Sequence, residues 1–163
     1  MCVSLDDFYL TYAEQSAVAE ETGNPLLEFR GNAGSHDVAL ASETLRRLKG
    51  INKDDAGAEV LVPRYDKTAN SGFGDRAPQE SWTTVEGPLN VVLYEGWMLG
   101  FEPVGAEAAA AVNPALVAVD DKLEPYEERI ESLADAWLVI QIGDPEWVFD
   151  WRSQAEDATR KVN

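Results

Sequence analysis

The chain has very little of the chemistry on which disulfides and histidine-rich metal sites depend. Its 163 residues include a single cysteine, Cys2, and a single histidine, His36. One cysteine excludes an internal disulfide framework and any metal site built from several cysteines, and one histidine excludes a zinc site built from several histidines. The redox environment of the protein stays open at this point.

Positive charge and long apolar runs are also scarce. Thirteen Lys and Arg stand against thirty Asp and Glu, which gives a formal net charge of −17. Nucleic acids and anionic membranes are bound through Lys and Arg, so we expect neither as a partner. No apolar run reaches the roughly 18 residues of a membrane span, and no targeting segment follows Met1. A small anionic substrate remains compatible with this negative net charge, because a few arginines can create a positive pocket on an acidic protein.

Strand and helix patterns alternate along the chain. This order predicts an α/β fold with a parallel sheet, and the length suits one domain. Two of the predicted strands, 90–94 and 136–142, are continuously apolar, as is typical of strands buried on both faces. Residues 64–88 are polar and rich in turn residues, and a loop of this length is a lid, a binding loop or disordered. The other predicted elements are strands at 3–5 and 59–62 and helices at 11–21, 38–50, 113–133 (interrupted at Pro125) and from 144 onward.

Polar side chains follow three of the predicted strands, where ligands bind in open α/β sheets. Asp6 and Asp7 follow the first strand, Glu95 follows the third and Asp144 follows the fourth. Asp144 precedes a proline and is interpreted as a helix cap. Glu95 needs either solvent or a cationic partner at the end of a buried strand, and a magnesium-linked role fits it.

Three short motifs resemble those of the P-loop small-molecule kinases, which include uridine kinase, phosphoribulokinase, type I pantothenate kinase and glycerate kinase. The motifs are Ser4-Leu5-Asp6-Asp7-Phe8-Tyr9, similar to S-x-D-x-F-Y; Pro63-Arg64-Tyr65-Asp66-Lys67, similar to P-x-Y-D; and Leu93-Tyr94-Glu95-Gly96, similar to a strand-ending Glu-Gly. Within this group the chain resembles the plant and fungal D-glycerate 3-kinase family, in order and over nearly its whole length. The stretches that carry this second resemblance are 24–37, 63–76, 86–101 and 151–156.

The resemblance implies ATP-dependent phosphorylation of D-glycerate to 3-phosphoglycerate, with Mg²⁺. It places the role of orienting or deprotonating the attacking hydroxyl on Asp6, and it places Arg152 beside the transferring phosphate. Asp6 and Glu95 would hold magnesium, directly or through water. The glycerate carboxylate calls for cationic forks, which arginine supplies better than lysine. The substrate-binding candidates are Tyr9, Arg30, His36, Arg64, Tyr65 and Arg76.

Simpler interpretations of some of these residues stay open. His36 stands beside Asp37 and fits the capping network of the next helix. Any one of the arginines also fits an ordinary exposed position. Asp7 occupies a position that varies between members of the resembled group, so its role is secondary to that of Asp6.

The sequence lacks the Walker A loop G-x-x-x-x-G-K-[ST] that cradles phosphate in P-loop kinases. None of its lysines follows such a loop: Lys49, Lys53, Lys67, Lys122 and Lys161. We therefore expect a P-loop NTPase-like parallel sheet flanked by helices, without its first strand and phosphate-binding loop. Residues 1–163 would form a single partial kinase domain that is inactive alone, with a lid or substrate loop around 64–88.

Other functions are compatible with the same residues. The chain could be a non-catalytic remnant or binding module of such a kinase, or belong to a kinase for another small hydroxylated substrate. An unrelated acidic scaffold would require the ordered motifs to be a coincidence. The resemblance implies the chloroplast and photorespiration for a photosynthetic source, and the cytoplasm otherwise. Nothing in the sequence indicates an oligomeric state.

Overall fold

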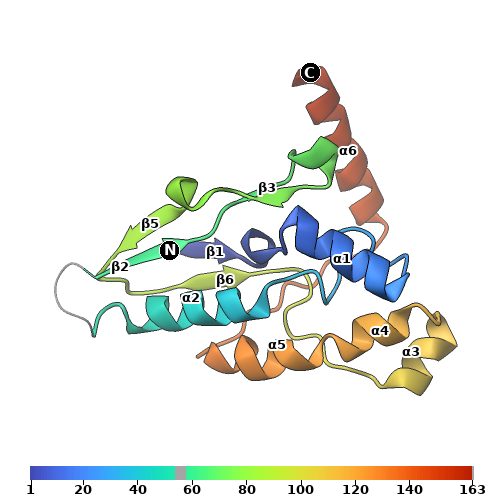
Figure 1. The fold of residues 1–163 in the computed structure, drawn as a ribbon, viewed down its shortest axis with the longest axis horizontal. Coiled ribbons are helices and arrows are strands. Elements are labelled where there is room, and N and C mark those ends of the chain that lie inside the picture. The colour runs from blue at the N-terminus through green and yellow to red at the C-terminus, as the bar shows by residue number, and fades with distance from the viewer. Residues whose placement is uncertain (54–57, 163) are drawn as a thin grey trace.

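A parallel pair of short strands lies near the centre of the computed structural model, which describes residues 1–53 and 58–162 (Figure 1). Strand β1 (Cys2–Ser4) pairs with β6 (Leu93–Glu95), and Ser4 lies opposite Glu95. Parallel neighbours require a long crossover, and here the described part of the intervening chain supplies two α-helices and four other strands. Because the two strands run in the same direction, the residues that follow them meet at one edge of the pair.

Helix α1 (Tyr12–Thr22) confirms the helix predicted over 11–21. It begins at Thr11, whose hydroxyl accepts a hydrogen bond from the backbone N–H of Glu14, while the Glu14 carboxylate accepts from the backbone N–H of Thr11. This reciprocal pair satisfies donors that a helix start leaves unbonded. The helix ends at Gly23, which adopts the left-handed conformation (φ 57°) favoured by glycine.

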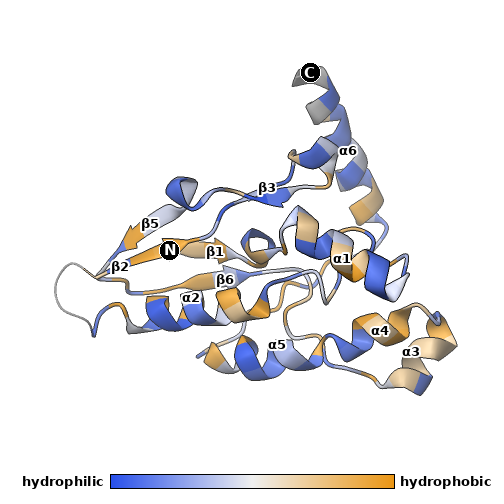
Figure 2. Cartoon of the chain, viewed as in Figure 1, coloured by the Kyte–Doolittle hydropathy of each residue, from blue (hydrophilic) through white to orange (hydrophobic). Residues whose placement is uncertain are grey.

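Helix α2 (Val38–Gly50) begins where the sequence predicted, at the cap Asp37. The Asp37 carboxylate accepts a hydrogen bond from the backbone N–H of Leu40 at 2.9 Å. The helix places one face against the strands, and its apolar stripe at Ala41, Leu45 and Leu48 is buried. Its exposed residues are mostly charged (Glu43, Arg46, Arg47 and Lys49), and part of the helix is hydrophilic in Figure 2. Burial of the stripe therefore fixes the loop before α2 next to the strand ends.

The polar segment 64–88 forms short strands and turns. Strand β2 (Glu59–Val62), predicted from the sequence, pairs antiparallel with β5 (Thr83–Glu86). Between them β3 (Tyr65–Asp66) pairs antiparallel with β4 (Asp75–Arg76). Backbone hydrogen bonds between strands therefore order this segment, although its many turn residues predicted only a loop. Its role as a lid stays a prediction.

The strand predicted over 136–142 is wrong. These residues form no strand, and Leu138, Val139 and Ile140 are 79%, 83% and 82% exposed. A strand requires a neighbour for its backbone N–H and C=O groups, and none of the strands in the described ranges pairs with this segment. An apolar run predicts that a segment can be buried, but only a partner makes it a strand.

The strand predicted over 90–94 is only partly right. Strand β6 covers Leu93–Glu95, so it starts later and includes the glutamate that was expected to follow it. Leu93 is 52% exposed and Val91 is 68% exposed, so the strand is not buried on both faces. The observed sheet is therefore a short parallel pair inside a mixed α/β fold.

The C-terminal part of the chain, as far as the structure describes it, contains four α-helices, and the single helix predicted over 113–133 is divided. Helix α4 ends before Pro125, which lies in the first turn of α5, and α3 was not predicted. The predicted cap Asp144 accepts a hydrogen bond from the backbone N–H of Glu146 at 3.0 Å, in the turn that leads into α6. The helices are α3 (Ala106–Val112), α4 (Leu116–Asp121), α5 (Glu124–Arg129) and α6 (Trp147–Val162).

The hydrophobic core joins β1, β2, β5, α2 and α5. It packs the first residues of the chain against elements from the middle and from α5, and its members include Val3, Leu5, Phe8, Leu48, Val60, Val85, Met98, Tyr126 and Ile130. The core therefore fixes the end of β1, where Asp6 lies.

No helix in the described ranges combines the length and hydrophobicity needed to cross a bilayer.

Candidate functional site

Asp6 lies directly after β1, in a single turn of 3₁₀ helix over Leu5–Phe8. Its Oδ1 accepts a hydrogen bond from the Tyr9 hydroxyl at 2.9 Å, and its Oδ2 accepts one from Lys67 Nζ at 2.6 Å. Burial raises the pKa of Asp6, but the hydrogen bonds from Lys67 and Tyr9 and the positive charge of Lys67 outweigh it, so the pKa falls below its usual value. The result is an ionised carboxylate whose two oxygens are both oriented.

The β3–β4 hairpin brings Tyr65 and Lys67 to this carboxylate. The backbone N–H of Tyr65 donates to Asp7 Oδ1 at 3.3 Å, and the Tyr65 ring meets the edge of the Tyr9 ring with centroids 5.2 Å apart. Burial raises the pKa of Asp7 despite the hydrogen bond from Tyr65 and the charge of Arg64. The two carboxylates therefore differ, because Lys67 neutralises Asp6 directly whereas Asp7 anchors the hairpin.

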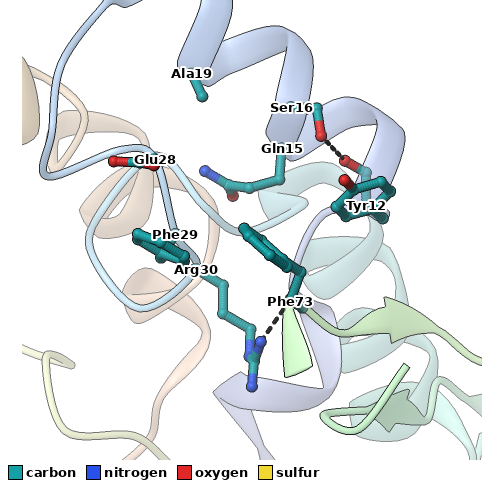
Figure 3. Close-up of a pocket in the computed structure, with 8 residues that line it drawn as sticks. All are labelled: Tyr12, Gln15, Ser16, Ala19, Glu28, Phe29, Arg30 and Phe73. Carbon is teal, nitrogen blue, oxygen red and sulfur yellow. Dashed lines mark hydrogen bonds between the residues drawn. The ribbon is translucent and has the colours of Figure 1, made fainter. Parts of the chain in front are cut away.

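Arg30 holds the same hairpin from outside. Its guanidinium donates to the backbone carbonyls of Gly72 at 2.8 Å and of Lys67 at 3.3 Å, as well as to that of Phe73. It also lies 5.6 Å from the centre of the Tyr65 ring. Figure 3 shows the Arg30 side chain extending past Phe29 toward Phe73. Several N–H donors of Arg30 are thus already bonded to backbone carbonyls of the protein.

A small pocket of about 160 Å³ lies beside Arg30. Phe29 stacks on Phe73 there, with ring centroids 5.2 Å apart and planes 20° apart. Among the described residues that line the pocket, Arg30 is the only cation. Its guanidinium is already bonded to the hairpin, so the pocket is poorly suited to a small carboxylate. Its lining residues are Tyr12, Gln15, Ser16, Ala19, Glu28, Phe29, Arg30 and Phe73 (Figure 3).

His36 supports Tyr9 from the interior. The imidazole is 5% exposed, stacks on the Tyr9 ring with centroids 4.4 Å apart, and shares a hydrogen bond of 2.8 Å between Nδ1 and the Tyr126 hydroxyl. Burial lowers the pKa of His36 to about 4, so the ring is neutral at neutral pH. In this conformation His36 faces other side chains, and its predicted contact with substrate stays a prediction.

Arg76 and Arg64 differ in how far they are engaged. Arg76 donates to the backbone carbonyl of Tyr9 at 3.0 Å and to Asp37 Oδ2 at 3.1 Å, and its side chain is 14% exposed. It therefore ties the end of the Asp6 turn to the cap of α2. Arg64 is exposed between β2 and β3, with its charge close enough to lower the pKa of Asp7.

Glu95 and Arg152 are not bonded to the side chains of this cluster. Both are exposed, and in the described ranges neither makes a hydrogen bond or ion pair with Asp6, Tyr9 or Lys67. No three His, Cys, Asp or Glu side chains come together to hold a metal ion in the part of the chain that the structure describes. Two carboxylates at neighbouring strand ends still suit Mg²⁺, which keeps several of its waters and uses few protein ligands.

Two residues of the cluster were not predicted. Lys67 ends the Pro63–Lys67 motif, so its position two residues after Tyr65 was an available signal. Tyr126 lies 90 residues from His36 and receives a hydrogen bond from the backbone N–H of Gly34 at 3.2 Å. No local pattern marks Tyr126 as part of the site, because only the packing of α5 brings it there.

The chain is similar in sequence to curated kinases. No family model matches the sequence. The chain is 51% identical over 160 residues to "D-glycerate 3-kinase, chloroplastic" of Arabidopsis thaliana, covering 98% of this chain and 35% of that protein. It is 34% identical over 169 residues to the "Uncharacterized kinase mug58" of Schizosaccharomyces pombe, covering 96% of this chain and 59% of that protein.

A solved structure matches as well. The D-glycerate 3-kinase of Cryptococcus neoformans var. grubii superposes with a TM-score of 0.88 at 35% sequence identity, covering 99% of this chain and 60% of that one. The chain therefore spans between about a third and three fifths of the length of these relatives.

Proposed function

For a chain that belongs to the D-glycerate 3-kinase family of P-loop kinases, we propose that it forms the acceptor-substrate part of an ATP-dependent kinase acting on D-glycerate. One observation carries the proposal. The Asp6 carboxylate stands at the end of a parallel strand, oriented by Tyr9 and Lys67, with tyrosines and arginines around it. A substrate hydroxyl that accepts a phosphoryl group needs such a carboxylate to orient it, and the anionic group of the same substrate needs the arginines and tyrosines nearby.

Phosphoryl transfer asks a protein mainly to position the reactants and to stabilise charge. In this proposal ATP, with Mg²⁺, supplies the phosphoryl group. Asp6 accepts a hydrogen bond from the attacking hydroxyl of D-glycerate and directs the oxygen toward the phosphorus. A lowered pKa suits this role, because the carboxylate stays ionised and orients the hydroxyl without first having to lose a proton of its own.

The remaining candidates divide by how free their side chains are. Arg64 is exposed beside the site, so we assign it to the carboxylate of D-glycerate. Tyr9 and Tyr65 border the acceptor, whereas Arg30, Arg76 and His36 support these neighbours from behind.

The phosphate side of the reaction is assigned to Glu95 and Arg152. Glu95 would hold Mg²⁺ together with Asp6, because Ser4 and Glu95 lie opposite each other in the strand pair. Arg152 would act beside the transferring phosphate. We further propose a chloroplast location and a role in photorespiration if the source is photosynthetic, from the similarity to the Arabidopsis protein.

The proposal is tested by titrating the chain with D-glycerate in a calorimeter. We expect binding that Asp6→Asn weakens at least about tenfold, the loss typical of a charged hydrogen-bond partner. Asp135→Asn is the matched control, because Asp135 also pairs with a lysine (Lys49, 2.7 Å) but lies outside the site. Equal affinities of Asp6→Asn and the unsubstituted chain would remove Asp6 from its role.

Catalysis needs a separate measurement. We expect no D-glycerate-dependent release of ADP from the chain alone, since its sequence has no phosphate-binding loop. A longer gene product that includes such a loop should release ADP and lose this activity on Asp6→Asn substitution. Binding of D-glycerate without ADP release in that longer product would favour the binding-module alternative.

A further inference from the structure

Lys67 forms the shorter of the two ion pairs at the site described above, the other being that between Arg76 and Asp37 at 3.1 Å. Its Nζ lies 2.6 Å from Asp6 Oδ2, although the two residues are 61 positions apart in the chain. The lysine side chain is 56% exposed and the aspartate side chain is 31% exposed. An ion pair with this exposure contributes little to folding stability. Its geometry therefore calls for an explanation other than stability.

The backbone around Lys67 is held on both sides. The Lys67 carbonyl accepts a hydrogen bond from Arg30, and the neighbouring Asp66 carboxylate accepts two from Thr68, from the backbone N–H at 2.8 Å and the hydroxyl at 2.6 Å. Two residues earlier, Tyr65 is bonded to Asp7. These contacts anchor the base of a flexible side chain, which lowers the entropic cost of holding its ammonium in one place.

The hairpin also approaches the Tyr65 ring closely at Gly74. Gly74 has a φ of +81°, and a Cβ at this position would lie 2.5 Å from Tyr65 Cε1 and 3.0 Å from an Arg30 guanidinium nitrogen. The glycine thus lets Tyr65 and Arg30 come together under the hairpin that carries Lys67.

We propose that Lys67 is a positioning residue, which fixes the plane of the Asp6 carboxylate toward the acceptor hydroxyl. With Tyr9 as its only donor, the carboxylate could rotate about its terminal torsion. Donors on both oxygens, Tyr9 on Oδ1 and Lys67 on Oδ2, restrict it to one orientation. This inference rests on the proposed function, and it adds a residue that acts through Asp6.

The test compares D-glycerate affinity in three lysine variants by calorimetry. Lys67→Met should weaken binding about tenfold, as expected for the loss of a charged hydrogen bond. Lys67→Arg should restore most of the affinity, because the guanidinium keeps both the charge and the reach. Lys49→Met, which removes the remote ion pair with Asp135, should leave the affinity unchanged. Thermal melts check that each variant is folded, and Lys67→Gln serves as a second neutral variant.

A neutral ligand separates positioning from direct contact with the substrate. Glyceramide keeps the hydroxyls of glycerate but replaces its carboxylate with an uncharged amide. If Lys67 acts through Asp6, Lys67→Met weakens glyceramide and D-glycerate to a similar extent. A loss confined to D-glycerate would show that Lys67 binds the substrate carboxylate itself and would overturn the inference.

The remaining outcomes distinguish this inference from the proposed function. If the unsubstituted chain binds D-glycerate and Lys67→Met binds it equally well, the inference alone is wrong. If the unsubstituted chain does not bind D-glycerate, the proposed function is wrong and the inference falls with it.

Discussion

Residues 5–8, where one predicted strand ends, and residues 137–140, inside another predicted strand, both contribute large apolar side chains, but the molecule uses them in opposite ways. Leu5 and Phe8 have no exposed surface, whereas Leu138 and Ile140 are 79% and 82% exposed. The first stretch carries Asp6 between its two buried side chains. The second carries no residue of the described cluster.

Contacts with neighbouring residues explain this difference in exposure. Phe8 packs edge-on against Tyr94, with ring centroids 6.2 Å apart, and its carbonyl accepts a hydrogen bond from the backbone N–H of Asp37. Residues 137–140 pair with none of the strands in the described ranges. Apolar character therefore produces structure only where neighbours cover the side chains and bond the backbone.

The largest effect on stability should come from a substitution in the buried stretch, residues 5–8. Phe8→Ala removes a fully buried ring and leaves a cavity, which we expect to lower the free energy of unfolding by about 3–5 kcal/mol. Chemical denaturation monitored by tryptophan fluorescence measures the change. A loss below about 1 kcal/mol, the range of ordinary surface sites, would mean that the end of β1 is not held by its core contacts.

The buried histidine makes the same region sensitive to pH. Burial lowers the pKa of His36 from 6.5 to about 4. Between these values the unfolded chain binds a proton that the folded chain excludes, so the free energy of unfolding falls as the pH is lowered through this window. The loss approaches about 3 kcal/mol at the lower end.

A matched variant isolates the histidine contribution. His36→Asn removes the titrating ring while the acidic side chains still titrate in both proteins. The free energy of unfolding, measured from pH 7 to pH 4, should therefore fall less steeply in His36→Asn. Parallel curves for the two proteins would contradict the neutral, buried state of His36.

The smallest effect belongs to the exposed stretch. Ile140→Ala removes apolar surface that is already in water, so the free energy of unfolding should change by less than about 0.5 kcal/mol. The same denaturation experiment used for Phe8→Ala checks it. A loss comparable to that of Phe8→Ala would show that residues 137–140 are covered in solution, and the contrast between the two stretches would disappear.

Much of the fold followed from local patterns. The cap Asp37 and the stripe at Ala41, Leu45 and Leu48 predicted α2, because both signals depend on neighbours within one helix. The strand at 136–142 could not be judged in this way, since pairing depends on segments elsewhere in the chain. The same limit applies to the short strands within 64–88, whose turn-rich sequence hides their pairing.

The candidate site shows the same division. The position of Asp6 after a strand could be predicted from the first nine residues, and the motif that ends at Lys67 was visible in the sequence. The contact between them was not, because a salt bridge across 61 residues depends on where the β3–β4 hairpin lies. The support of His36 by Tyr126 was equally hidden.

By itself, the sequence determined which residue types could act: a strand-end carboxylate, a set of arginines and tyrosines, and a charge balance that disfavours nucleic acid. These are properties of composition and of spacing along the chain. Only the tertiary structure decided which of them meet. It placed Lys67 on Asp6, used Arg30 and Arg76 to hold backbone carbonyls, and buried His36 behind Tyr9. The physical reason is that hydrogen bonds and burial act over a few ångströms in space, whatever the separation in sequence.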